Sequence, residues 1–287
     1  MRVEPRISNA LSVDVEDWFQ VGAFETIIDR SEWDRLPPRV ERNADAVLAL
    51  FDRAGVKGTF FTLGWVAERY PALVARIAAA GHEVASHGWD HQRVFTMDAE
   101  KFRADLRRAR AAIEQASRIA VTGYRAPSFS IDSRTPWAHR VLAEEGYAYS
   151  SSVAPIAHDH YGWREAPRFA FRPIADAGLI ELPVTTVEVG GRRAAAGGGG
   201  FFRLLPYRFS SWAIRRVNQR EGRPAVFYFH PWEIDPGQPR VAGAPFKSRL
   251  RHYTNLARME PKLLKLLRSF AWERTDAVVE RERDRLQ

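Results

Sequence analysis

The 287-residue chain contains no cysteine, which excludes disulfide bonds and leaves only histidines and carboxylates as strong metal ligands. No apolar run approaches the roughly 18 residues that a membrane-spanning helix needs. Residues 1–6 lead directly into a strand-like segment and show none of the apolar stretch of a secretory signal. We therefore expect a cytoplasmic protein without a transmembrane segment, and attachment to a membrane surface stays open.

Three familiar sequence motifs are also missing. The four glycines at 197–200 are not followed by the Lys-Ser/Thr of a phosphate-binding loop, and no Rossmann fingerprint precedes a helix. No Gly-x-Ser-x-Gly element is present, so Ser151 and Ser152 are weak candidates for a nucleophile. We expect residues 194–200, which contain only Ala and Gly, to form a mobile loop near the mouth of a site.

Basic residues outnumber acidic ones, but they are spread along the sequence. Forty-three Lys and Arg residues face 35 Asp and Glu residues, a net charge of +8. Such a surplus could attract nucleic acid, anionic lipid or an acidic glycan. The basic residues alternate with acids, as in 101–118 and 273–285, and no dense basic tract occurs. We therefore expect no nucleic-acid partner.

Strand-like and helix-like segments alternate along the chain. The expected strands cover residues 10–15, 58–63, 83–86, 121–125, 147–150, 180–182 and 225–230. The expected helices cover residues 39–54, 66–80 with Pro71 near its start, 98–116, 136–145, 209–221, and one or two stretches within 250–270. This alternation favours an α/β fold of parallel strands with crossover helices, as a barrel or an open sheet.

Polar residues follow several of these strands, where α/β folds gather their chemistry. His87 and His91 lie four residues apart after strand 83–86, so a helical or similar tight turn brings both rings to one side. Asp14, Glu16 and Asp17 end the first strand, and their mutual repulsion calls for a cation. Two histidines and one carboxylate are a common catalytic Zn²⁺ set, which indicates a metal-assisted hydrolase.

Other strand ends supply further candidates. His230 ends strand 225–230 and suits proton transfer near neutral pH. Arg125 could hold a catalytic carboxylate in a bidentate pair, and the backbone N–H of Ser128 could face an oxyanion. Trp89 and Trp232 lie close to these segments, where they could bind substrate by stacking on sugar rings or serve as ordinary core residues.

In order along the chain, these motifs resemble carbohydrate esterase family 4, the NodB-homology polysaccharide deacetylases. The matching segments are residues 11–17, 58–64, 81–91, 125–127 and 229–231. The resemblance implies an irregular (β/α)7 barrel that binds Zn²⁺ or another divalent ion such as Co²⁺, Mn²⁺ or Ni²⁺. It also implies removal of acetyl groups from N-acetylated amino sugars.

Residues 14–18, 197–207 and 251–256 resemble more narrowly the deacetylases encoded with exopolysaccharide and exosortase (PEP-CTERM) loci. This resemblance implies an N-acetylated exopolysaccharide or a lipid-linked glycan precursor as substrate. We expect a single barrel domain over 1–240 and a helical C-terminal extension over 241–287 packed on the barrel. The sequence leaves the oligomeric state open, a homo-oligomer included.

The resemblance also implies roles for the polar residues. Asp14 would be the catalytic base, oriented by Arg125, and His230 would protonate the leaving amine. His87 and His91 would bind the metal.

The third metal ligand is open, because the family's first motif has two adjacent aspartates and this chain does not. Asp17 or Glu16 fills the position, and a split acid-x-acid motif favours Glu16. The family's fourth motif, a Trp-Asp pair, has no counterpart, so His230 has no assigned partner. Two alternatives stand beside deacetylation: hydrolysis of another non-peptide C–N bond, as in allantoinase-like relatives, and a catalytically silent glycan-binding protein.

Overall fold

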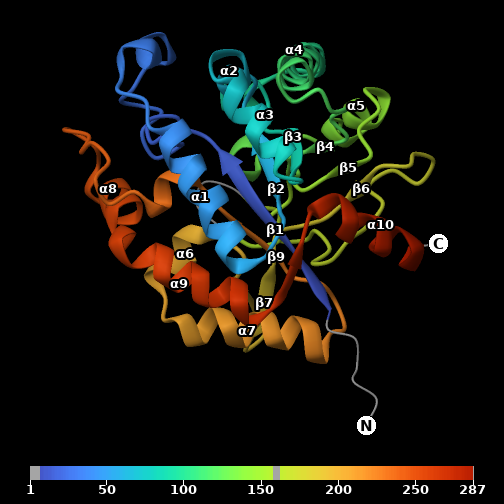
Figure 1. Ribbon diagram of the computed structural model, residues 1–287. Coiled ribbons are helices and arrows are strands. Elements are labelled where there is room, and N and C mark those ends of the chain that lie inside the picture. The colour runs from blue at the N-terminus through green and yellow to red at the C-terminus, as the bar shows by residue number, and fades with distance from the viewer. Residues whose placement is uncertain (1–6, 158–161, 287) are drawn as a thin grey trace.

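A curled sheet of parallel strands forms the centre of the protein, here a computed structural model that describes residues 7–157 and 162–286 (Figure 1). Its strands are β1 (Ser8–Val15), β2 (Thr59–Thr62), β3 (Glu83–Ser86), β4 (Gly123–Tyr124), β5 (Tyr149–Ser150), β6 (Ile180–Glu181), β9 (Val226–Phe229) and β10 (Ala271–Glu273). The strands β1 to β6 pair in chain order, and β1 also pairs with β9 and β10. The predicted α/β fold of parallel strands is confirmed.

Helices surround this sheet, and a small antiparallel hairpin, β7 (Thr186–Val189) and β8 (Arg192–Ala195), lies apart from it. The helices are α1 (Val40–Ala54), α2 (Gly64–Arg69), α3 (Pro71–Ala79), α4 (Ala99–Ser117), α5 (Ala138–Glu144), α6 (Gly199–Leu204), α7 (Tyr207–Arg220), α8 (Phe246–Tyr253), α9 (Leu256–Ser269) and α10 (Thr275–Arg285). In the described part of the chain, no helix combines the length and apolar composition needed to cross a membrane. Residues 1–6, which were read for a secretory signal, lie outside the described residues.

Local sequence signals explain where several helices begin and end. The side chain of Asp98 caps α4 by accepting from the Lys101 N–H at 2.8 Å. Gly55 ends α1 in the left-handed conformation, with φ 66°, which glycine adopts without steric cost. Pro71 is the first residue of α3, so the single helix expected over 66–80 is two helices.

The inner face of the sheet has an apolar layer in its middle and polar residues beyond it at the carboxyl end of β1. Ala10, Phe61 and Ala85 belong to one buried apolar cluster inside the curl, whereas the alternate residues of β1 pack beneath the helices. Ser12 and Asp14 continue the inward row of β1 toward its carboxyl end. The fold therefore places polar side chains at the carboxyl end, above an apolar floor.

The glycine-rich segment, residues 194–200, closes the curled sheet between β6 and β9. Thr185 N–H donates to Val226 O at 3.3 Å, and Tyr228 N–H donates to Gly197 O at 2.8 Å. A Cβ at Gly197 would lie 2.2 Å from Val226 O, so only glycine allows this approach. The expectation of a mobile loop over 194–200 is wrong, because β8 and α6 incorporate its ends and its centre is buried in the wall.

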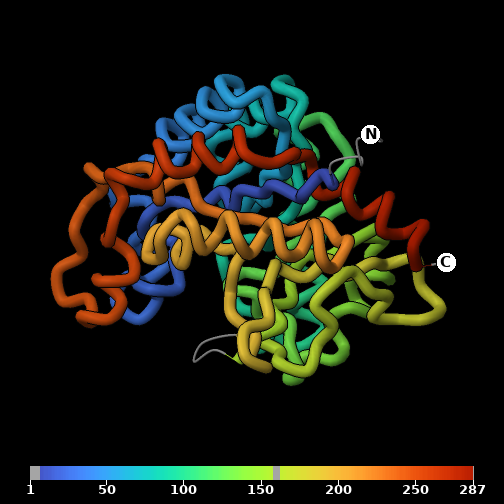
Figure 2. Tube along the Cα trace, turned by 90° about the horizontal axis from the view of Figure 1, so that it is seen from below, coloured from blue at the N-terminus to red at the C-terminus, as the bar shows by residue number. Residues whose placement is uncertain are grey.

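The C-terminal region spans the molecule from α8 at one end to α10 at the other (Figure 2). It contains more than the expected helices, since β10 pairs in parallel with β1, Ser8 opposite Ala271. At the start of α10, Thr275 N–H donates to Thr59 Oγ1 at 2.7 Å and Asp276 N–H to Glu83 Oε2 at 3.1 Å. These bonds tie α10 to the amino end of the sheet. The division at residue 240 stays a prediction.

Because of Glu83, which accepts from the start of α10, the free energy of unfolding depends on pH. Burial, reinforced by the Asp276 charge, raises the pKa of Glu83 from 4.5 to about 7. The folded state binds this proton more tightly, so the stabilisation is present below pH about 4.5 and is lost as pH rises through about 7. The loss amounts to about 3 kcal/mol. In Glu83→Gln, this fall in the free energy of unfolding should be absent. Urea unfolding at pH 5 and pH 8 measures it.

The matched control is Glu273→Gln, which changes a partly exposed glutamate of β10. It should keep the pH dependence of the unaltered protein. A fall between pH 5 and pH 8 that persists in full in Glu83→Gln would contradict the prediction.

Candidate metal centre and active site

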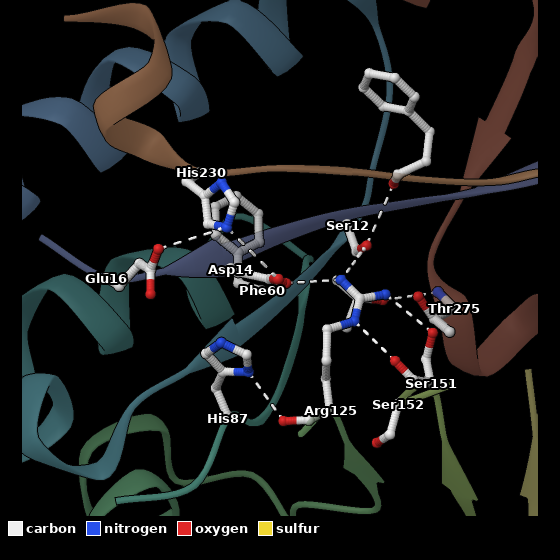
Figure 3. Close-up of polar contacts among 12 residues, drawn as sticks. Ser12, Asp14, Glu16, Phe60, His87, Arg125, Ser151, Ser152, His230 and Thr275 are labelled. Atoms are coloured by element: carbon white, nitrogen blue, oxygen red, sulfur yellow. Dashed lines mark hydrogen bonds and ion pairs between the residues drawn. The ribbon is translucent and has the colours of Figure 1, made fainter. Parts of the chain in front are cut away.

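The carboxyl ends of β1, β3, β4 and β9 bring the candidate residues of four distant segments together. Figure 3 shows Asp14, near the end of β1, and Glu16, just after it, facing His87, Arg125 and His230. All five residues are buried or half-buried. The structure therefore assembles most of the polar residues singled out in the sequence around one point.

Glu16, His87 and His91 form a compact set of possible metal ligands. One ligand atom from each lies within 4.8 Å of the others, and all three side chains are buried. Glu16 Oε2 lies 2.9 Å from His91 Nε2 but forms no well-directed hydrogen bond. A buried oxygen left in this state is costly unless a cation satisfies it. The donor set fits a divalent metal ion such as Zn²⁺.

His87 is oriented by the backbone of the neighbouring strand. Its Nδ1 lies 2.9 Å from Arg125 O, so Nδ1 carries the hydrogen and donates it to that carbonyl. Burial lowers the pKa of His87 to about 4. The imidazole is therefore neutral, and its Nε2 lone pair is available to a metal.

The loop that carries His91 is not helical. Gly64 N–H donates to Gly88 O at 2.9 Å and Trp65 N–H to Trp89 O at 2.9 Å, so the loop is tied to the start of α2. His91 has a left-handed backbone, φ 61°. The rings of His87 and His91 have centroids 5.4 Å apart. A bent loop, rather than the expected helix-like turn, brings both rings to one side.

Asp17 lies apart from this set. Its Oδ2 accepts from Arg39 N–H at 2.7 Å and from Val40 N–H at 3.0 Å, and its Oδ1 accepts from Trp18 N–H at 2.8 Å. Burial, partly offset by these donors, raises the pKa of Asp17 to about 6. The carboxylate is occupied at the start of α1, so the geometry favours Glu16 over Asp17 as the acidic ligand.

Arg125 is fully buried and holds Asp14 from below. Its Nη1 donates to Asp14 Oδ1 at 2.6 Å and to Ser12 Oγ at 2.8 Å. Its Nε and Nη2 donate to the carbonyl and hydroxyl of Ser151, each at 3.0 Å. The bidentate pair expected with a carboxylate is wrong, because only one nitrogen reaches Asp14. Asp14 Oδ2 faces His230, with 4.0 Å to Nε2.

His230 lies between two carboxylates. Its Nδ1 is 2.8 Å from Glu233 Oε1, and its Nε2 is 3.4 Å from Glu16 Oε1. Burial disfavours the charged ring, but Glu16, Glu233 and Asp14 outweigh burial and raise the pKa of His230 to about 9. The ring is therefore disposed to carry a proton at neutral pH.

The two tryptophans expected to contact substrate are packed against protein. Trp232 stacks between His230 and His252, with centroid distances of 5.1 and 4.1 Å, and its Nε1 donates to Glu16 Oε1 at 3.2 Å. With both faces covered, Trp232 has no face for a sugar. The Trp89 ring lies outside the sheet, 3.4 Å from the Arg108 guanidinium carbon. The structure does not bring Trp89 to the site.

Ser128 follows Arg125 in a short turn with a left-handed backbone, φ 54°. Its Oγ lies against Gly22 of the loop after β1. The role given to its N–H stays a prediction. Beside His91, a pocket of about 70 Å³ opens onto the same loop, lined by residues 19–21, Glu25, residues 28–30 and Trp33.

Sequence reasoning missed the residues that hold the site in place. Ser12 and Ser151 are ordinary small polar residues, and no local pattern marks them as partners of a buried arginine. Glu233 had a signal, since His230 and Glu233 have the spacing of a helix capping box, which the structure shows at Pro231–Ile234. Only the fold reveals that Arg203 reaches Glu233.

Comparison with known proteins now adds to this geometry. Residues 32–149 match the polysaccharide deacetylase family model. This part of the chain is therefore similar to polysaccharide deacetylases. Residues 151–280 match a second family model, described as a domain of unknown function (DUF3473).

Curated relatives match this chain over part of its length. A peptidoglycan deacetylase of Helicobacter pylori is 29% identical over 107 residues, which are 37% of this chain and 36% of that protein. Peptidoglycan-N-acetylglucosamine deacetylase PgdA of Listeria monocytogenes is 33% identical over 102 residues, 34% of this chain and 20% of that protein. The chain thus matches well under half the length of these two relatives.

A solved structure supports the fold over nearly the whole chain. A crystal structure named as a candidate polysaccharide deacetylase from Mycobacterium smegmatis superposes with a TM-score of 0.64. At 21% identity, it covers 99% of this chain and 94% of the other. The predicted NodB-type barrel is confirmed. The exopolysaccharide subfamily and the choice of zinc stay predictions.

The candidate metal ligands can be tested directly. Glu16→Ala and His91→Ala should each weaken Zn²⁺ binding by at least about 100-fold, because each removes one of three ligand atoms. Asp17→Asn should leave the affinity within about threefold and lower the stability instead, since it weakens the cap on α1. Equilibrium dialysis with Zn²⁺ measures the affinities. Tight binding in Glu16→Ala together with loss in Asp17→Asn would reverse the assignment.

Proposed function

We propose that this protein is a metal-dependent deacetylase that hydrolyses the N-acetyl groups of amino sugars in an exopolysaccharide or its lipid-linked precursor. The observation that carries the proposal is the convergence of the Glu16, His87 and His91 set with an acid–base pair, Asp14 and His230. The match of residues 32–149 to polysaccharide deacetylases supports the same reaction.

Glu16, His87 and His91 would hold the metal in this proposal. A divalent ion in such a site supplies Lewis-acid polarisation of a carbonyl and lowers the pKa of a water molecule. Neutral His87 and ionised Glu16 suit this task, because His91 and His230 outweigh the effect of burial and lower the pKa of Glu16 to about 2. Glu16 and His87 are therefore in the protonation states that metal binding requires.

Asp14 and His230 divide the proton transfers. Asp14, held by Arg125 through Oδ1, has Oδ2 available to take a proton from the water that attacks the acetyl carbon. His230, which is protonated at neutral pH, gives a proton to the sugar nitrogen as the C–N bond breaks. Water is consumed, and the products are acetate and a free amino sugar.

The proposed activity is tested by acetate release. The purified protein should release acetate from N-acetylglucosamine oligomers, a metal chelator should abolish the release, and Zn²⁺ or Co²⁺ should restore it. Small ureides should not be hydrolysed. Binding of the oligomers without acetate release in the presence of each metal would show a glycan-binding protein instead.

The base is tested by Asp14→Asn. Because a positioned general base contributes roughly 10²- to 10⁴-fold, kcat should fall by that factor while the Zn²⁺ affinity changes little. Asp17→Asn, three residues along the same segment, is the matched control and should keep most of the activity per folded molecule. Equal kcat values for the two variants would remove Asp14 from the mechanism.

A further inference from the structure

A second buried ion pair lies behind the acid–base pair. Arg203 Nε donates to Glu233 Oε2 at 2.6 Å, and the two side chains are 1% and 0% exposed. Charges so deeply buried are expensive to desolvate, and an apolar pair of similar size would stabilise a fold as well. The pair therefore calls for an explanation beyond stability.

The remaining nitrogens of Arg203 are also engaged. Nη1 donates to His252 O at 3.0 Å and to Thr254 O at 2.7 Å, and Nη2 donates to Arg251 O at 2.9 Å. These carbonyls belong to the end of α8 and the turn after it. The C-terminal region thus fixes the guanidinium, and the guanidinium fixes the carboxylate of Glu233.

The other oxygen of Glu233 faces His230. Oε1 accepts from His230 N–H at 3.1 Å and lies 2.8 Å from His230 Nδ1. An ionised carboxylate can only accept, so Nδ1 must carry the hydrogen of this contact. Nε2 then faces Asp14 and Glu16, at 4.0 and 3.4 Å.

Gly199 leaves the space that Glu233 occupies. A Cβ at Gly199 would lie 2.3 Å from Glu233 Oε1 and 2.7 Å from Oε2. This glycine has no positive φ, so the contact with Glu233, rather than backbone conformation, is what the absent side chain permits.

We propose that Glu233, held by Arg203 and accommodated by Gly199, is the positioning residue that fixes the ring orientation of His230 and keeps a hydrogen on its Nδ1. This inference rests on the proposed function, because it assigns a partner to the acid of that reaction. Arg203, Glu233 and the α8 carbonyls all lie within residues 151–280, which match a domain of unknown function. The inference therefore assigns a role to this part of the chain. The metal ligands His87 and His91 come from the other matched region.

The first test separates positioning from binding. In Glu233→Gln, kcat for acetate release should fall about 10- to 100-fold, as for the loss of an orienting partner. KM for the glycan and the Zn²⁺ affinity should stay within about twofold. Lys262→Met is the matched control, because Lys262 Nζ donates to Leu205 O and so tethers α6 to α9 without contacting Glu233. Equal losses in both variants would overturn the proposal.

The second test uses non-additivity. Gly199→Ala should lower kcat by displacing the carboxylate, although it leaves Glu233 chemically unchanged. In a Glu233→Ala background, Gly199→Ala should cost nothing further, because it acts only through Glu233. If the fold-losses in kcat of the two single variants multiply in the double variant, Gly199 acts by another route, and the proposed positioning by Glu233 is contradicted.

The third test does not require activity. With ¹⁵N-labelled histidine, the unaltered protein should show a downfield imidazole N–H proton at His230, identified by its absence in His230→Asn. This resonance should move upfield in Glu233→Gln and stay in place in Lys262→Met. If no acetate is released yet this signature holds, the proposed function fails and the Glu233 contact stands. If acetate is released but the signature is unmoved, the positioning role fails alone.

Discussion

The buried guanidinium of Arg125 is the interaction on which the rest of the site depends. A charge inside the sheet must be fully satisfied, and Ser12, Asp14 and Ser151 supply the acceptors. The carbonyl of Arg125 in turn accepts from His87 Nδ1. One residue therefore sets the direction of both the proposed base and a proposed metal ligand.

The acceptors of Arg125 are themselves held by a carboxylate on the next strand. Glu181 Oε1 accepts from Ser152 N–H at 2.8 Å and from Val153 N–H at 2.9 Å, and its Oε2 lies 3.0 Å from His139 Nε2. This fixes the chain just after β5, where Ser151 meets the guanidinium. Arg203 and Glu233 act similarly on the opposite wall. Two buried carboxylates, Glu181 and Glu233, thus support the two halves of the site.

The strands and the polar residues at their ends could be predicted from the sequence, because both depend on local patterns. Residues 83–86 form a strand as expected, and α4 covers nearly all of the helix expected over 98–116. The strands β7, β8 and β10 were not expected, because runs of three or four residues give too little periodicity to recognise. The glycine-rich stretch was misjudged, since low complexity suggests mobility while close backbone packing also demands glycine.

The sequence by itself determined the α/β alternation, the presence of two histidines and an acidic cluster after strands, and the likeness to a deacetylase family. Only the tertiary structure distinguishes Glu16 from Asp17 as a candidate ligand, because both acids follow the same strand and differ in what lies opposite them. It also decided the partner of His230 and the packing of Trp89 and Trp232. These choices depend on contacts between segments far apart in the chain, such as Trp232 with Glu16, which no local pattern records.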